Sequence, residues 1–270
     1  MALFAGLALW PTKNHDGRGT MIVRLEEEST RASSLDAPPM SRTACLAQLR
    51  AAKPVVLPSL LLCDFGNLQS EVDRLEMAGV SAYHLDVMDG QFVPNLTYGM
   101  PIVEAMRRLT HRPLDVHLMV ARPERYLREF KQAGADVLTV HVEALDAPRE
   151  TLQAIRELDM VAGLAVNPAT PLTQVEACLD LCDLVLIMSV PAGFGGQKFD
   201  PAALERVRRI RELAGDDLLL EMDGGINAST IADCSAAGAQ FFVVGSGIFR
   251  TRDYTEAVRN LKELALSGKR

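Results

Sequence analysis

The sequence predicts a (β/α)₈ barrel, and two features of the chain lead to this prediction. Eight short apolar runs rich in β-branched residues recur from residue 55 onward, and segments with helical spacing separate them. Eight such units in about 215 residues suit this fold, for which roughly 250 residues are typical. A doubly wound open sheet is the alternative, but it usually needs fewer strands, and no GxGxxG motif follows the first run.

The eight runs are the predicted strands. In chain order they are VVLPSLLL (55–62), AYHLDV (82–87), PLDVHLMV (113–120), DVLTVHVEA (136–144), MVAGLAVNP (160–168), LVLIMSV (184–190), LLLEMDGG (218–225) and QFFVVGS (240–246). Helical spacing is clear after the first run, where Leu68, Val72 and Leu75 recur at i, i+4 and i+7. Pro123 and Gly134 mark the start and the end of another predicted helix.

Residues 1–50 differ from the rest of the chain, because two long segments, NHDGRGT (14–20) and EEESTRASSLDAPPMSRT (26–43), are polar and show no sustained periodicity. We interpret them as an N-terminal extension, either disordered or the product of a misplaced start codon, with Met21 and Met40 as later starts. Residues 51–270 are then predicted to form a single catalytic barrel.

Composition restricts the class of protein. The formal net charge of −7 argues against nucleic-acid binding, which needs a basic surface. Five scattered cysteines without a CxxC motif suit a reduced, cytoplasmic protein. The apolar run at residues 2–10 is too short to span a bilayer, and no basic segment precedes it, so we expect neither a signal peptide nor a membrane span.

Polar residues gather near the carboxyl ends of four predicted strands, where barrel enzymes carry their catalytic groups. They are Ser59, His84, Asp86, Asp115, His117, Glu221 and Asp223. Side chains two residues apart on a strand share a face, so His84 and Asp86 point the same way. A charged pair on such a face is costly unless it is paired or bound to a metal. Histidine and aspartate are suitable ligands for one divalent metal ion, Zn²⁺, Fe²⁺, Mn²⁺ or Co²⁺, and carboxylates can also serve as bases.

Glycine motifs follow the last three strands and predict a phosphate site. They are GFGGQ (193–197), DGG (223–225) and GSG (245–247). Glycine lets backbone N–H groups approach an anion closely, and phosphate sites after strands seven and eight are frequent in this fold. A metal beside opposed carboxylates suits proton transfer at a carbon next to a carbonyl, and hence a two-base epimerisation. A decarboxylase of the orotidine-phosphate kind would need an Asp-x-Lys-x-x-Asp array, which strands two and three lack.

Several motifs closely resemble the ribulose-phosphate 3-epimerase family. They are PSLLLCDF, HLDVMDGQFVPNLTYG, PLDVHLMV, NPATPL, GFGGQKF, MDGGIN and GSGIF, in order over residues 54–265. The resemblance implies a metal-dependent TIM barrel that interconverts D-ribulose 5-phosphate and D-xylulose 5-phosphate. These phosphosugars belong to the pentose phosphate pathway and the Calvin cycle. It also implies a homo-oligomer, either a dimer or a hexamer.

Site residues follow from the resemblance by position. It implies that His84, Asp86, His117 and Asp223 bind the metal, with Asp86 as proton acceptor and Asp223 as proton donor. The implied substrate-binding residues are Ser59, His117, Gly193, Phe194, Gly195, Gly196, Asp223, Gly224, Gly225, Gly245 and Ser246. Met88, Met119 and Met188 would line the pocket beside the enediolate.

Four other polar residues near these strand ends are expected to have structural roles. Asp115 and Glu221 share the parity of the implied ligands, but we interpret them as supporting residues. We expect His141 and Glu143 to hydrogen-bond locally.

One loop departs from the family. The family usually has a polar residue and a proline before Gly-Phe after strand six, whereas this chain has Pro191 and Ala192. We expect activity to survive this change. Epimerisation of a hexulose 6-phosphate such as allulose 6-phosphate, and phosphosugar binding without catalysis, remain as alternatives.

Overall fold

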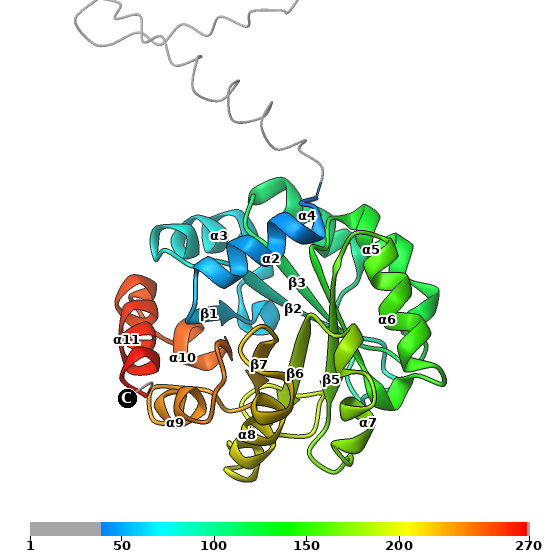
Figure 1. Cartoon of the computed structure of the whole chain (residues 1–270). Helices are drawn as coiled ribbons and strands as arrows, with labels where there is room; N and C mark the ends of the chain where they lie inside the picture. Colours follow the sequence, from blue (N-terminus) through cyan, green and yellow to red (C-terminus); the bar gives the residue numbers. More distant parts are fainter. Residues whose placement is uncertain (1–38, 269–270) are drawn as a thin grey trace, which may run out of the picture. The chain divides into compact units, whose positions relative to one another are not determined.

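In the computed structural model, which describes residues 39–268, eight parallel strands form one sheet with helices around it (Figure 1). The strand order is β1-β8-β7-β6-β5-β4-β3-β2, and every pairing along it is parallel. A further parallel bridge between Ser59 and His84 joins the two outer strands of this order. The sheet is therefore a nearly closed barrel, which confirms the predicted fold.

Each strand overlaps one predicted run. The strands are β1 (Val55–Pro58), β2 (Tyr83–Met88), β3 (Leu114–Met119), β4 (Val137–His141), β5 (Val161–Val166), β6 (Leu184–Met188), β7 (Leu219–Asp223) and β8 (Phe241–Val244). The runs are longer than the strands because several of them continue into 3₁₀ turns or glycine loops. Such turns follow β1 at Leu60–Leu62 and β4 at Val142–Ala144.

The α-helices lie between the strands, apart from one that precedes β1 and those that follow β8. They are α2 (Arg42–Ala51), α3 (Leu68–Met77), α4 (Met100–Leu109), α5 (Leu127–Ala133), α6 (Pro148–Glu157), α7 (Thr173–Glu176), α8 (Ala202–Ala214), α9 (Ile231–Ala236), α10 (Ser246–Phe249) and α11 (Tyr254–Ser267). Pro123 begins a 3₁₀ turn rather than α5 itself, and Gly134 ends α5 with φ = 108°. Among the described residues, no helix is long and apolar enough to cross a bilayer.

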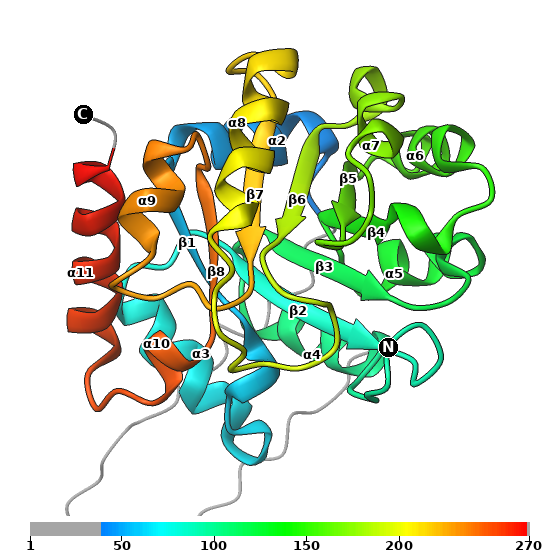
Figure 2. The ribbon, with the colours of Figure 1, turned by 90° about the horizontal axis from the view of Figure 1, so that it is seen from below.

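Helix α2 corrects the expected boundary at residue 50, because it lies inside the predicted extension. Ser41 caps the helix, and Cys45, Leu46 and Leu49 have the spacing of one helical face. These three residues pack with the first residues of several strands, so α2 covers the end of the barrel at which the strands begin (Figure 2). The barrel domain therefore includes α2. Residues 1–38, for which we expect an extension, lie outside the residues that the structure describes.

Strand alternation separates the two sides of the barrel wall. Leu85 and Val116 point outward into the core beneath the helices, whereas Val55 and Leu219 belong to the cluster packed against α2. Further along the inward face, apolar residues give way to buried polar ones, among them His84. One end of the barrel is thus filled with apolar side chains, and the other carries the candidate site.

The packing of α2 gives a stability test. Leu49 is buried, and replacing a buried leucine with alanine typically costs about 2–5 kcal/mol. Leu49→Ala should therefore lower the free energy of unfolding by this amount in urea denaturation. Thr43→Ala, at an exposed position of the same helix, should change it by less than about 0.5 kcal/mol. Equal effects would show that α2 does not pack into the barrel core.

Candidate active site

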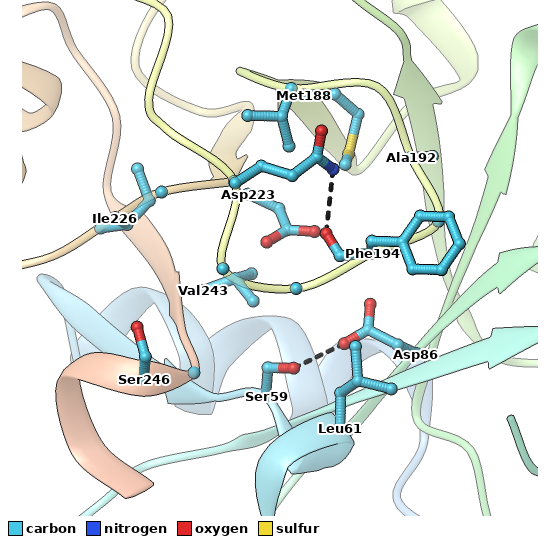
Figure 3. A pocket seen from close by; sticks show the side chains of 18 of the residues that line it. Ser59, Leu61, Asp86, Met188, Ala192, Phe194, Asp223, Ile226, Val243 and Ser246 are labelled. Carbon is cyan, nitrogen blue, oxygen red and sulfur yellow. Dashed lines mark hydrogen bonds between the residues drawn. The ribbon is translucent and has the colours of Figure 1, made fainter. Parts of the chain in front are cut away.

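A cavity of about 210 Å³ opens at the carboxyl ends of the strands. Its lining includes most of the residues that the sequence singled out, namely Ser59, Asp86, Met88, Met119, Met188, Gly193, Phe194, Gly195, Gly196, Asp223, Gly224, Gly225, Gly245 and Ser246. His84 and His117 are fully buried and do not line the cavity. Figure 3 shows the carboxyl groups of Asp86, from β2, and Asp223, from β7, in this cavity.

Asp86 holds the centre of the polar cluster. Ser59 Oγ donates a hydrogen bond of 2.6 Å to Asp86 Oδ2. His84 Nε2 and His117 Nδ1 each lie 3.3 Å from the other oxygen, Oδ1. The backbone N–H of Asp86 donates to Tyr98 Oη at 3.1 Å, which fixes the end of the strand. The side chain of Asp86 is thereby held by groups from β2, β3 and the residue that follows β1.

The cluster has the chemistry and spacing of a metal site. One donor atom from each of His84, Asp86, His117 and Asp223 lies within 4.8 Å of the others. His84 Nε2 is buried and makes no hydrogen bond within the described part of the chain. Two atoms that bind one zinc ion tetrahedrally at about 2.0–2.1 Å lie about 3.3 Å apart. The two nitrogens are at this distance from Asp86 Oδ1, so the donor set fits a divalent cation.

Two further carboxyl groups lie at the opposite nitrogen of His84. Asp115 Oδ2 is 2.7 Å from His84 Nδ1, and Glu221 Oε1 is 3.1 Å from the same atom. These three residues also have donor atoms within 4.8 Å of one another. However, a ring nitrogen that donates a hydrogen bond to a carboxylate cannot also bind a metal. Asp115 thus orients the ring and directs Nε2 toward Asp86, an arrangement common among metal-binding histidines.

The electrostatics of His84 favour a positive charge at its Nε2. Burial lowers the pKa of the imidazole, but the carboxylates of Asp86 and Asp115 outweigh this effect and hold the pKa well above its usual value. A proton and a metal ion compete for the same nitrogen lone pair, so metal binding would release this proton.

The two cavity carboxyl groups differ in protonation. Burial raises the pKa of Asp86, but the charge of His84 and the contacts with both histidines outweigh it, so this pKa lies below its usual range. Burial and the nearby charge of Asp86 raise the pKa of Asp223 to about 7. Asp86 is therefore ionised where Asp223 still holds a proton. Carboxyl groups whose environments separate their pKa values in this way are suited to act as a base and an acid.

Side-chain hydrogen bonds hold the loop after β6 over the cavity. Asn95 Nδ2 donates to Gly193 O at 2.7 Å, and Gln197 Nε2 donates to Pro191 O and Phe194 O. Ala192 N donates to Asn167 Oδ1 at 2.9 Å, a bond that the proline usual in the family could not make. The departure at Ala192 therefore provides an additional anchor for the loop.

The glycines of the loop after β7 occupy positions that other residues cannot easily take. Gly224 and Gly225 have φ = 106° and 64°. A Cβ atom on Gly225 would lie 2.5 Å from the backbone nitrogen of Phe199. These positions require glycine both for conformation and for close approach of the neighbouring loop.

Sequence reasoning missed part of the role of His141. Its expected local bond to Glu143 is confirmed, with 3.1 Å between His141 Nδ1 and Glu143 Oε2. The structure adds a 2.8 Å contact between His141 Nε2 and His117 Nε2. Both side chains point inward from neighbouring strands. The alternation of side chains along each strand, together with the strand order, could have indicated this contact from the sequence. Asn167 was also missed, although it lies 3.3 Å from His141 Nδ1.

Comparisons with known proteins now identify the family. The model of the ribulose-phosphate 3 epimerase family matches residues 55–249. The ribulose-phosphate 3-epimerase of Synechocystis is 46% identical over 213 residues, which cover 77% of this chain and 93% of that protein. The enzyme of Bacillus subtilis is 44% identical, covering 77% and 97%, and that of Escherichia coli K12 is 41% identical, covering 78% and 96%.

This chain belongs to the ribulose-phosphate 3-epimerase family. The resemblance seen in the motifs is confirmed, and the protein is an isomerase of the epimerase class acting on carbohydrates. The family is one of divalent-metal-dependent epimerases, in agreement with the His and Asp cluster.

Solved structures are similar in fold. Orotidine 5'-phosphate decarboxylase from Pyrococcus horikoshii OT3 has a TM-score of 0.57 at 18% identity, covering 78% of this chain and 99% of that one. A mutant tryptophan synthase α-subunit from the hyperthermophile Pyrococcus furiosus has a TM-score of 0.59 at 17% identity, covering 78% and 98%. At these identities the likeness shows the barrel fold alone.

The raised pKa of Glu221 makes the free energy of unfolding depend on pH. Burial and the charge of Asp115 raise its pKa to about 8, against about 4.3 in an unfolded chain. Between these values the folded protein binds more protons, so the free energy of unfolding falls as pH rises. Glu221→Gln imitates the protonated form, and this contribution to the slope should disappear. Urea unfolding of chelator-treated protein at about pH 5 and about pH 8 measures it. A stability difference between variant and wild type that is independent of pH would contradict the raised pKa.

The loop after β6 gives a second test. The double change Pro191→Asn and Ala192→Pro restores the residues usual in the family but removes the hydrogen bond to Asn167. One hydrogen bond typically contributes about 0.5–1.5 kcal/mol. Steady-state kcat and KM should therefore change by less than about tenfold, which corresponds to about 1.4 kcal/mol. A larger gain in activity would show that the natural loop limits turnover.

Proposed function

We propose that this protein interconverts D-ribulose 5-phosphate and D-xylulose 5-phosphate by moving a proton at C3. Membership of the ribulose-phosphate 3-epimerase family supports this substrate. The observation that carries the proposal is the pair of cavity carboxyl groups, Asp86 and Asp223, which differ in protonation. Epimerisation through two such groups needs one to accept a proton while the other is ready to give one.

Asp86 acts as the proton acceptor and Asp223 as the proton donor in one direction, and the roles are exchanged in the other. The hydrogen bond from Ser59 occupies Asp86 Oδ2 and fixes the orientation of the carboxylate. Asp223 approaches from β7, which β8 and β1 separate from β2 around the barrel. The substrate would lose its C3 proton to Asp86 on one face, and the planar enediolate so formed would gain a proton at C3 from Asp223 on the other face, which inverts C3.

His84, Asp86, His117 and Asp223 would hold the metal ion. The nitrogen and oxygen donors suit Zn²⁺, Fe²⁺, Mn²⁺ or Co²⁺. A bound divalent ion supplies Lewis-acid stabilisation of negative charge on the oxygens of the reacting carbons. The protein orients the substrate against the two carboxyl groups and keeps His84 and His117 out of contact with solvent.

Glycine loops after the last three strands would hold the phosphate group. Gly193 to Gly196, Gly224, Gly225, Gly245 and Ser246 line one part of the cavity, and backbone N–H groups at such positions can face an anion. Met88, Met119 and Met188 line another part and offer an apolar surface beside the enediolate. Polarizable methionine side chains pack well against such an irregular shape.

We also propose a cytoplasmic location and a homo-oligomeric state for this protein. The net charge of −7 and the reduced, buried cysteines support a cytoplasmic protein that binds neither nucleic acid nor membranes. Exposed apolar side chains, among them Leu62, Phe65 and Leu96, support assembly into a homo-oligomer, a dimer or a hexamer.

The decisive experiment is a coupled assay of metal-loaded protein with D-ribulose 5-phosphate, following D-xylulose 5-phosphate. Asp86→Asn and Asp223→Asn should each lower kcat by about 10²- to 10⁴-fold, because each removes one proton-transfer group. Asp146→Asn removes an exposed carboxylate outside the cavity and should leave kcat unchanged.

Either of two results would refute the proposal. Turnover that survives in both variants would exclude the two-carboxylate mechanism. Absence of turnover by the wild-type protein would refute the substrate, and D-allulose 6-phosphate would then be assayed in the same way.

A further inference from the structure

Both ring nitrogens of His117 have partners. Nδ1 lies 3.3 Å from Asp86 Oδ1, and Nε2 lies 2.8 Å from Nε2 of His141. The two imidazole rings are fully buried, with centroids 4.9 Å apart and ring planes inclined by 25° to each other. Two facing ring nitrogens at this distance share one hydrogen, so one ring donates and the other accepts. The direction of this hydrogen bond determines what His117 presents to Asp86.

Glu143 sets the direction. Its Oε2 lies 3.1 Å from His141 Nδ1, while its Oε1 accepts a bond of 2.7 Å from the backbone N–H of Asn167. An ionised carboxylate can only accept, so the hydrogen is on His141 Nδ1. In a neutral imidazole the other nitrogen, Nε2, is then bare. His141 Nε2 therefore accepts the hydrogen carried by His117 Nε2.

We infer that Glu143 and His141 hold His117 in the tautomer whose Nδ1 carries no hydrogen. This lone pair faces the carboxylate of Asp86, and two electron-rich atoms 3.3 Å apart repel each other unless a cation lies between them. The inference rests on the proposed metal centre and deepens it, because it makes Glu143 and His141 positioning residues for the metal. It also specifies Nδ1 as the nitrogen of His117 that binds the ion.

Asn167 competes for the same atom of His141. Its Nδ2 lies 3.3 Å from His141 Nδ1, and its Oδ1 accepts from Ala192 N, so the amide hydrogens point toward the ring. Donation from Asn167 to Nδ1 would reverse both tautomers. The carboxylate of Glu143 lies closer, and hydrogen bonds to ionised acceptors are roughly twice as strong as neutral ones. Glu143 therefore prevails.

The tautomers can be read directly by NMR. The full-length protein contains five histidines, which are labelled with ¹⁵N. The labelled protein is treated with chelator and then loaded with Zn²⁺. Long-range ¹H–¹⁵N spectra of both forms distinguish protonated ring nitrogens from bare or metal-bound ones. We expect His117 to be protonated at Nε2 and His141 at Nδ1 in the Zn²⁺-loaded form, in which the ion lies between His117 Nδ1 and Asp86. In the chelator-treated form, the carboxylate of Asp86 competes with Glu143 for the hydrogen, because it faces His117 Nδ1 at 3.3 Å. Protonation of His141 at Nε2 in the Zn²⁺-loaded form would overturn the inference.

The Glu143→Gln variant tests whether the carboxylate of Glu143 determines the tautomer of His117. The glutamine amide can donate to His141 Nδ1 as well as accept from it, so His117 should no longer hold a single tautomer. The dissociation constant for Co²⁺, measured by chelator competition, should rise about 10- to 100-fold. Glu150→Gln removes an exposed charge on α6 and should change neither quantity. Unchanged Co²⁺ affinity in Glu143→Gln would overturn the inference.

Two variants of His141 separate hydrogen bonding from packing. His141→Gln retains an acceptor for His117 Nε2, whereas His141→Leu fills similar space without one. Co²⁺ affinity should stay near the wild-type value in the first variant and fall in the second. Equal affinities in the two variants would show that His141 acts by packing alone.

These readouts are independent of turnover. Expected tautomers and Co²⁺ affinities in a protein without epimerase activity would contradict the proposed function but not the inference.

Discussion

The buried carboxylate of Asp86 is the group on which the rest of the site depends. Its charge lies in the barrel interior, where an unpaired ion would be strongly destabilising. Ser59 and the two histidines surround it, and its charge in turn raises the pKa of Asp223. A single buried negative charge thus creates both the candidate cation site and the difference in protonation between the two carboxyl groups.

The barrel separates this polar cluster from its apolar interior. Inward-pointing residues near the start of most strands are apolar and pack with α2, while several of those further along the strands are polar. The polar groups contact one another in layers, since Asp115 and Glu221 lie against His84, and Glu143 contacts His141. Each of the two ring nitrogens that face Asp86 Oδ1 therefore has a carboxylate on the far side of its ring, directly for His84 and through a second ring for His117.

The loops add cavity-lining residues to the polar groups of the strands. Asn167 contacts His141 on one side and accepts from Ala192 on the other, so the loop after β6 is tied to the histidine pair. This connection exists because Ala192 has an N–H that the usual proline lacks. The departure from the family pattern therefore has a defined structural consequence, which could not be recognised before the two loops were placed together.

The sequence by itself determined the barrel, its strands and the parity of His84, Asp86, His117 and Asp223, because strand alternation is a local property. It also indicated the glycine loops. It did not reveal that α2 belongs to the barrel, since one short helix before β1 gives a weak periodic signal. Only the tertiary structure decided that His141 contacts His117, that Asp115 lies behind His84, and which carboxyl group keeps its proton. These features depend on the register between strands and on burial, and both arise only when the sheet closes.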